Sequence, residues 1–210
     1  MLKLIVFDCD GVLFDSRAAN EAFYNDMLAA FSCPPMSREE LDFVHMHNVV
    51  DSVQHIFRHY PGIEQGAVER YRAGIDYGRF LKYLKMEDGL VEFLEMARQR
   101  CRLAISTNRT NTMRPLLATY RLTDYFDMVV TAADVKNPKP APDALLAILS
   151  AFDCRPEEAL FIGDSILDQH HAAGCEVPFI AFKNSELTAD YHVNGFADLG
   201  NLAVIKASLY

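Results

Sequence analysis

The chain has 210 residues, which is enough for one large domain or for a core domain with a smaller inserted one. Half of the residues are hydrophobic, and this composition argues against an intrinsically disordered chain. The 20 basic and 29 acidic side chains give a net charge of −9 without a dense Lys/Arg block, which argues against nucleic acid and anionic membranes as partners.

The five cysteines are scattered along the chain without C-x-x-C spacing. This arrangement favours reduced thiols that serve in packing over a zinc site or a disulfide framework. The N-terminal apolar run is too short for a signal peptide, and the later apolar runs are too short for a membrane span. We therefore expect a soluble cytoplasmic protein.

The first predicted element is a buried strand over residues 4–7. Its four apolar residues run directly into Asp8 and Asp10, followed by Gly11. Carboxylates avoid burial unless a partner neutralises them, so the transition from apolar run to acid suggests a bound metal, a substrate or both. The glycine would permit backbone geometry that a Cβ would hinder.

Residues 16–88 have a different pattern and favour helices throughout. The sequence "SREE" at 37–40 is typical of a capping box, and residues 49–60 and 68–84 carry amphipathic helical spacing. We therefore predict a helical domain at 16–88, inserted into a core domain formed by residues 1–15 and 89–210.

After residue 88, strands and helices alternate along the chain. Strand-like runs cover 102–107, 126–131, 159–164 and 178–182, and helical patterns cover 89–100, 112–120 and 142–152. This alternation predicts an α/β fold with a doubly wound, Rossmann-like parallel sheet and a helical insert after its first strand. Ligands of such folds bind at the carboxyl ends of the strands.

Polar residues gather at several of these predicted strand ends. Asp8 and Asp10 follow the first strand, Thr107 and Asn108 end the second, and Asp164 ends the fourth. Lys139 lies between two prolines in the segment before the helix at 142–152, a position that restricts its backbone. Because parallel strands place these ends at one edge of the sheet, we expect the side chains to form one site.

This set of groups suits the chemistry of a phosphate ester. Crowded carboxylates repel one another, and Mg²⁺ relieves the repulsion by taking oxygen ligands. Asp8 could then be a carboxylate nucleophile, with Asp10 as the general acid and base. Thr107 and Asn108 can donate hydrogen bonds to phosphoryl oxygens, and Lys139 supplies positive charge.

Four segments resemble, in their order and spacing, the four motifs of the haloacid dehalogenase-like (HAD) hydrolase superfamily. They are "FDCDGVLFDS", "ISTN", "NPKPAPD" and "FIGDSILD". The chain is most similar to the phosphoglycolate phosphatase and β-phosphoglucomutase-like branch, which carries a helical cap between the first two motifs. The resemblance covers nearly the whole chain and implies an Mg²⁺-dependent phosphatase acting on a small phosphorylated metabolite.

The resemblance also implies roles for individual residues. Asp8 corresponds to the nucleophile, which forms an aspartyl-phosphate, and Asp10 to the acid/base. The Asp8 carboxylate, the Asp10 backbone carbonyl and Asp164 correspond to the Mg²⁺ ligands.

Three further residues match the later motifs. Thr107 matches the hydroxyl of the second motif and Lys139 the lysine of the third. Asp168 matches the second acid of the fourth motif, where it would order Lys139 or metal-bound water.

Alternative functions remain open at this point. A phosphomutase of the β-phosphoglucomutase type would use the same intermediate, and an aspartate phosphoacceptor module without turnover would need a similar acidic cluster. We expect a monomer or weak homodimer. His170 and His171 are predicted at a helix surface or an interface. For His45, His47 and Asn48, packing within a loop and contact with the substrate are equally open interpretations.

Overall fold

The structure, a computed structural model, describes residues 2–47 and 49–209, so the question raised for Asn48 lies outside the described residues. The chain divides into two compact units. One consists of Met1–Asp15 and Met86–Tyr210, and the other of Ser16–Lys85. We refer to them as the α/β unit and the helical unit.

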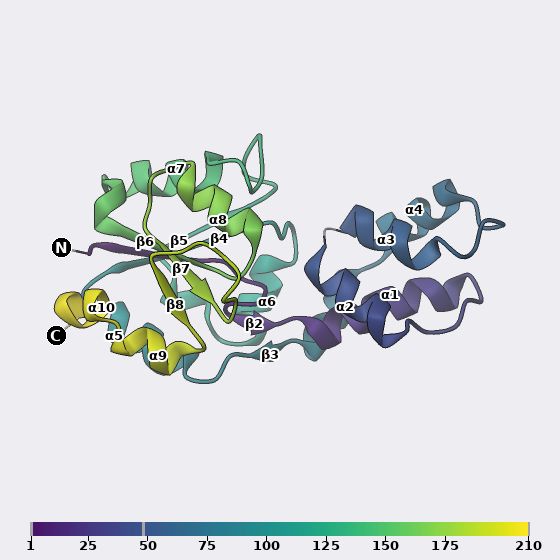
Figure 1. Ribbon diagram of the computed structural model, residues 1–210, viewed down its shortest axis with the longest axis horizontal. Helices are drawn as coiled ribbons and strands as arrows, with labels where there is room; N and C mark the ends of the chain where they lie inside the picture. Colours follow the sequence, from purple (N-terminus) through teal and green to yellow (C-terminus); the bar gives the residue numbers. More distant parts are fainter. Residues whose placement is uncertain (1, 48, 210) are drawn as a thin grey trace. The chain divides into compact units, whose positions relative to one another are not determined.

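A parallel sheet forms the centre of the α/β unit (Figure 1). Within the described residues it has six strands in the order β5-β4-β1-β6-β7-β8. Every neighbouring pair is parallel. The strands are β1 (Leu4–Phe7), β4 (Arg102–Thr107), β5 (Met128–Thr131), β6 (Ala159–Gly163), β7 (Phe179–Phe182) and β8 (Tyr191–Val193).

Helices cover both faces of this sheet, with α7 and α8 on one face and α5 and α9 on the other (Figure 1). Residues that alternate along a strand point to opposite faces, so Val6 packs with the α7 side while Phe7 contacts Phe93 and Phe196 of α5 and α9. The architecture confirms the predicted α/β fold with a parallel sheet wound on both sides.

The helices of the α/β unit connect or follow the strands. They are α5 (Leu90–Ala97), α6 (Met113–Thr119), α7 (Asp143–Ala151), α8 (Ile166–Ala173), α9 (Phe196–Asn201) and α10 (Ala203–Leu209), with short 3₁₀ turns η2 (Thr123–Tyr125) and η3 (Pro156–Glu158). Two short strands, β2 (Phe14–Asp15) and β3 (Lys85–Met86), lie at the points where the chain leaves and re-enters the unit.

The helical unit packs around an aromatic and aliphatic core that includes Phe23, Met27 and Ile56. The predicted capping box at the start of α2 is present, because the Ser37 side chain accepts from the Glu40 N–H and the Glu40 side chain accepts from the Ser37 N–H. The elements are α1 (Arg17–Ala30), α2 (Arg38–Met46), α3 (Val49–Phe57), α4 (Gln65–Gly74) and the 3₁₀ helix η1 (Tyr77–Tyr83).

Two local features differ from the sequence interpretation. The helical pattern at 68–84 is interrupted: α4 ends at Gly74, and Asp76 then caps η1 by accepting from the Gly78 N–H. Strand β8 is only three residues long and is flanked by Asp190 and Asn194, so its periodicity is too short to detect. No helix among the described residues is long and apolar enough to span a membrane.

Candidate active site

The register of the sheet brings the ends of three strands together. β1 lies between β4 and β6, with Phe7 opposite Ile105 on one side and Ile162 on the other. One residue further, the Asp8 N–H donates to the Ile162 carbonyl at 2.8 Å and extends the ladder beyond the strand. Asp8 is thereby fixed beside the carboxyl end of β6, which leads directly into Asp164.

Lys139 joins two buried carboxylates at this edge. Its Nζ donates to Asp8 Oδ1 at 2.6 Å and to Asp168 Oδ1 at 2.5 Å. The Lys139, Asp8 and Asp168 side chains are 4%, 9% and 1% exposed, so water screens these ion pairs very little. The structure thus brings together three residues that lie 131 and 29 positions apart in the sequence.

The N-terminus of α8 explains the position of Asp168. Ser165 and Asp168 form a capping box in which Ser165 Oγ accepts from the Asp168 N–H and the Asp168 carboxylate accepts from the Ser165 N–H. Asp168 Oδ2 also accepts from Ser165 Oγ at 2.6 Å, which leaves Oδ1 directed at Lys139. Gly163 permits this packing, because an added Cβ would come within 2.3 Å of the Asp168 Cβ.

Asp164 packs against the turn that follows β1. A Cβ at Gly11 would lie 1.9 Å from Asp164 Oδ2, and Gly11 has a φ of +79°, so both the space and the backbone require glycine. Asn184, which follows β7, holds the Asp164 loop by donating from Nδ2 to the Asp164 carbonyl at 2.9 Å.

Burial and mutual repulsion perturb the carboxyl groups. Burial raises the pKa of Asp8 to about 7, against the opposing effect of Lys139. Burial, with the negative charges of Asp8 and Asp168, raises the pKa of Asp164 to about 8. Burial disfavours the charged form of Lys139, but Asp168 and Asp8 outweigh it and raise the pKa of this amine. The cluster therefore has more carboxylates than the single lysine can neutralise.

A divalent cation fits this donor set. Carboxylate oxygens of Asp8, Asp164 and Asp168 lie within 4.8 Å of one another, and hard cations such as Mg²⁺ prefer oxygen ligands. Both Asp168 oxygens already accept from Lys139 and Ser165, so Asp8 and Asp164 are the better-placed pair. The raised pKa values of these two groups indicate the same deficit of positive charge.

Asp10 has a partner that the sequence interpretation missed. Arg109 Nε and Nη2 donate to the two Asp10 carboxylate oxygens at 2.7 and 2.6 Å, and the Arg109 side chain is only 7% exposed. Arg109 lies two residues beyond Thr107 at the end of β4. This position next to a strand end was the one indication in the sequence that Arg109 could belong to the site. The contact itself spans 99 positions and cannot be read from local spacing.

The β4 end also carries Thr107 and Asn108. Thr107 is buried, and its Oγ1 accepts from the Arg109 N–H at 3.1 Å, a bond that leaves the hydroxyl proton for another acceptor. Asn108 Nδ2 donates to the Lys139 carbonyl at 3.0 Å. Asn108 therefore holds the Lys139 loop in addition to any contact its second amide proton makes.

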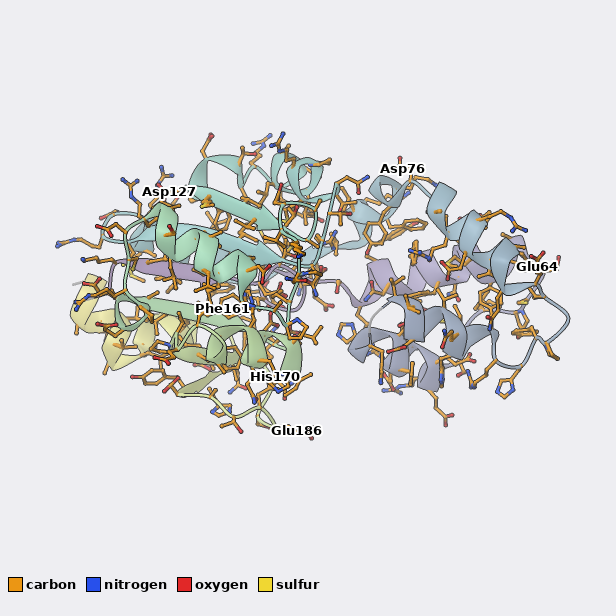
Figure 2. All side chains as sticks on the ribbon, turned by 90° about the horizontal axis from the view of Figure 1, so that it is seen from above. Glu64, Asp76, Asp127, Phe161, His170 and Glu186 are labelled. Atoms are coloured by element: carbon orange, nitrogen blue, oxygen red, sulfur yellow. The ribbon has the colours of Figure 1, made fainter. Side chains whose placement is uncertain are left out.

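The prediction of a helix surface or an interface for both histidines of α8 is wrong for His171. His170 is exposed, whereas His171 is fully buried (Figure 2 labels His170). His171 Nδ1 lies 2.6 Å from the Ala141 carbonyl oxygen and Nε2 lies 3.0 Å from Ser106 Oγ. Burial lowers the pKa of His171 to about 4. Helical spacing did not reveal this, because α8 is short and its amphipathic pattern is weak.

Comparisons with known proteins agree with the motifs. A model of the haloacid dehalogenase-like hydrolase family matches residues 5–182. A phosphoglycolate phosphatase from Pectobacterium atrosepticum is 30% identical over 187 residues, which cover 83% of this chain and 78% of that protein. A phosphoglycolate phosphatase from Rhodobacter capsulatus is 26% identical over 223 residues, which cover 96% of this chain and 95% of that protein.

Solved structures show the same fold. A HAD-superfamily hydrolase of subfamily IA from Geobacter sulfurreducens has a TM-score of 0.85 and 35% identity, and the match covers 97% of this chain and 96% of that one. CbbY from Rhodobacter sphaeroides, solved in complex with phosphate, has a TM-score of 0.76 at 22% identity, with 95% and 97% coverage, and shows the fold alone.

Proposed function

Because the chain belongs to the haloacid dehalogenase-like hydrolase family and is an enzyme of the phosphatase type found among its relatives, we propose that it hydrolyses small phosphomonoesters with the help of Mg²⁺. In this proposal Asp8 accepts the phosphoryl group as an aspartyl-phosphate and water then releases it. The observation that carries the proposal is the buried cluster of Asp8, Lys139, Asp164 and Asp168 at one sheet edge.

Asp8 has the surroundings that a carboxylate nucleophile needs. Lys139 holds its Oδ1 at 2.6 Å and so orients the carboxylate. Its raised pKa means that positive charge is required to keep the nucleophilic, ionised form at neutral pH. A divalent ion held by Asp8 and Asp164, with the Asp10 backbone carbonyl as the expected third protein ligand, would supply that charge and offset the charge of the phosphoryl oxygens.

In this proposal, Lys139 and Thr107 bind the phosphoryl group. The Lys139 amine keeps its proton, because Asp168 and Asp8 raise its pKa. It would therefore offer positive charge where the negative charge of the transferring phosphoryl group develops. The Thr107 hydroxyl proton and the second Asn108 amide proton are further donors at the same strand end. Asp168 would position the lysine, because it accepts a hydrogen bond from Nζ at 2.5 Å.

Asp10 would protonate the leaving oxygen and later accept a proton from the attacking water. Arg109 currently occupies both carboxylate oxygens of Asp10. Each carboxylate oxygen has a second lone pair, so the two Arg109 bonds leave sites on Asp10 at which it can hold a proton. Arg109 would therefore orient the Asp10 carboxylate for the acid/base role.

The names of the relatives indicate which substrate to test first. Two of them are phosphoglycolate phosphatases, so we propose phosphoglycolate or a phosphoester of similar size as the substrate of this chain. A panel of phosphorylated metabolites, assayed for released phosphate with and without Mg²⁺, tests this proposal. A phosphomutase would instead give an isomerised sugar phosphate without net release of phosphate.

The matched variants for this test are Asp8→Asn and Asp153→Asn. Asp8→Asn keeps the size of the side chain but removes the nucleophilic charge, so we expect phosphate release to fall by at least about 10³-fold. Asp153 is exposed and has a φ of +47°, which asparagine tolerates, so Asp153→Asn should keep wild-type turnover. Wild-type turnover by a folded Asp8→Asn variant would disprove the nucleophile assignment.

A further inference from the structure

His171 is a buried polar side chain that the proposed chemistry does not use. It lies on α8, three residues beyond Asp168, and is 0% exposed, whereas the adjacent His170 is exposed (Figure 2). Its two ring nitrogens reach two separate segments: Nδ1 contacts the Ala141 carbonyl and Nε2 contacts Ser106 Oγ. The edge of Phe161 in β6 packs against the ring at 5.2 Å between centroids.

The partners fix the protonation of the imidazole. A backbone carbonyl can only accept, so Nδ1 must carry a proton in order to bond to Ala141 at 2.6 Å. A neutral ring then has a lone pair on Nε2, which accepts the hydroxyl proton of Ser106. Both ring nitrogens therefore form hydrogen bonds, Nδ1 as a donor and Nε2 as an acceptor.

Each partner lies next to a residue of the active site. Ala141 is two residues beyond Lys139, and the Ala141 N–H donates to the Pro138 carbonyl at 3.0 Å, so the segment around Lys139 is a tight turn. Ser106 directly precedes Thr107 at the end of β4. His171 thus ties the Lys139 turn and the Thr107 strand end to the helix that carries Asp168.

We propose that His171 is a positioning residue whose Nδ1–H···O=C bond to Ala141 holds the turn that presents Lys139 to Asp8. This inference rests on the proposed phosphoryl transfer to Asp8. The Lys139 Nζ is held by Asp8 and Asp168, and Asn137 closes the turn by donating to Asp143. Two carbonyls within the turn accept from side chains of other segments: Asn108 donates to the Lys139 carbonyl and His171 to the Ala141 carbonyl. Losing the second donor releases one side of the turn, and Lys139 then shifts relative to the phosphoryl site.

The bond to Ser106 has a smaller role in this account. Ser106 lies inside a strand whose backbone is already fixed by pairing with β1 and β5. Removing its hydroxyl therefore leaves the position of Thr107 unchanged. The two ends of the same imidazole are expected to differ in their effect on turnover, which a histidine with a purely structural role would not produce.

The test uses two amide substitutions that each keep one end of the ring. In His171→Asn the amide nitrogen takes the place of Nδ1 and can still donate to Ala141. In His171→Gln the longer side chain places its amide near Nε2 and leaves the Ala141 carbonyl without its donor. Both variants carry a polar amide at the same buried position, and the shorter asparagine loses more packing, so a general loss of packing would lower turnover more in His171→Asn than in His171→Gln.

We expect His171→Gln to lower kcat for a phosphomonoester by about 10- to 100-fold with KM within about threefold, because small displacements of a catalytic group have effects of this size. His171→Asn and Ser106→Ala should stay within about threefold of wild type. Thermal unfolding identifies the fraction of each variant that is folded at the assay temperature. A folded His171→Gln with wild-type kcat, or equal losses in the Asn and Gln variants, would overturn the inference.

A spectroscopic measurement gives a second readout that does not need turnover. Long-range ¹H–¹⁵N correlation spectra of the wild-type protein should show a neutral His171 with its proton on Nδ1, and this pattern should persist in Ser106→Ala. A proton on Nε2 would overturn the inference even if the variants fail to fold. Wild-type protein that releases no phosphate from any ester would instead overturn the proposed function, and the inference with it.

Discussion

The Arg70–Glu64 pair of the helical unit and the Lys139 cluster of the α/β unit are at opposite extremes of burial. In the helical unit, ion pairs such as Arg70–Glu64 lie at the surface, with both side chains about 70% exposed and the closest atoms 3.4 Å apart. In the α/β unit, Lys139 and its two carboxylate partners are at most 9% exposed and 2.5–2.6 Å apart. Surface pairs cost little and contribute little, whereas buried charges need nearly complete compensation.

The difference indicates what each set of charges is for. The helical unit has an aromatic and aliphatic core around Phe23 and Ile56, and the Arg70–Glu64 pair outside this core remains in water. The α/β unit has an equally apolar core, yet it places Asp8 and Asp164 where their pKa values are raised to about 7 and 8. Such a costly arrangement is characteristic of a reaction site.

Among changes to the ion pairs, the largest effect should come from Lys139→Met, which leaves Asp8 and Asp168 without their common partner. We expect turnover to fall by at least about 10²-fold, because the charge that stabilises the transferring group is lost. Metal-free protein should also lose about 3–5 kcal/mol of stability at neutral pH, the typical result of removing one member of a buried ion pair. Phosphate release and urea unfolding measure the two effects.

The stability part of this prediction has its own check. Protonation of Asp8, whose pKa is raised by burial, removes its charge, so the loss should shrink as the pH is lowered. A variant as stable as wild type at neutral pH would contradict the view that Lys139 compensates buried charge.

A smaller effect is expected when the thermal stability of the wild-type protein is compared at different pH values with and without Mg²⁺. In the folded state the pKa values of Asp8 and Asp164 are raised from 3.8 to about 7 and about 8. Their favourable contribution to the stability of the fold is therefore complete below about pH 4 and is lost as the pH rises through these values. A cation binds the ionised forms, so Mg²⁺ should raise Tm more at about pH 8 than at about pH 5.

Thermal unfolding with Mg²⁺ or with a chelator measures this difference. For a chain of this length each kcal/mol corresponds to about 2–4 °C in Tm. Asp164→Asn is the control, since removing one raised carboxyl should reduce both the pH dependence and the response to Mg²⁺. An equal Mg²⁺ shift at both pH values would count against a metal site formed by these carboxylates.

The smallest effect is expected for Arg70→Ala in the helical unit. This change removes an exposed pair with Glu64, so the stability should change by less than about 1 kcal/mol and turnover should stay at the wild-type level. Urea unfolding beside Lys139→Met gives the direct contrast between an exposed and a buried pair. A loss as large as that of Lys139→Met would remove the distinction between the two units.

The alternation of strands and helices and the chemistry at strand ends were accessible from sequence, because apolar runs followed by polar residues repeat along the chain. This reasoning brought Asp8, Asp164 and Lys139 to one edge, where the structure has them in one cluster, although their catalytic roles stay predictions. It missed Arg109 and His171, because their partners lie 99 and 30 or more positions away and depend on how strands and turns pack.

Other expectations concern properties that the fold does not test. The cytoplasmic location, the small phosphorylated metabolite as partner and the monomer or weak homodimer stay predictions. They depend on the cell and on solution conditions, whereas the fold depends on local patterns that the sequence carries.

Trapping the covalent intermediate tests the central claim most directly. Wild-type protein turning over a phosphomonoester with Mg²⁺ is quenched with borohydride, which reduces an acyl phosphate to an alcohol, and peptide mass spectrometry locates the change. We predict conversion of Asp8 to homoserine, absent without substrate. Turnover with an unmodified Asp8, or with the change at another residue, would contradict the transfer of the phosphoryl group to this carboxylate.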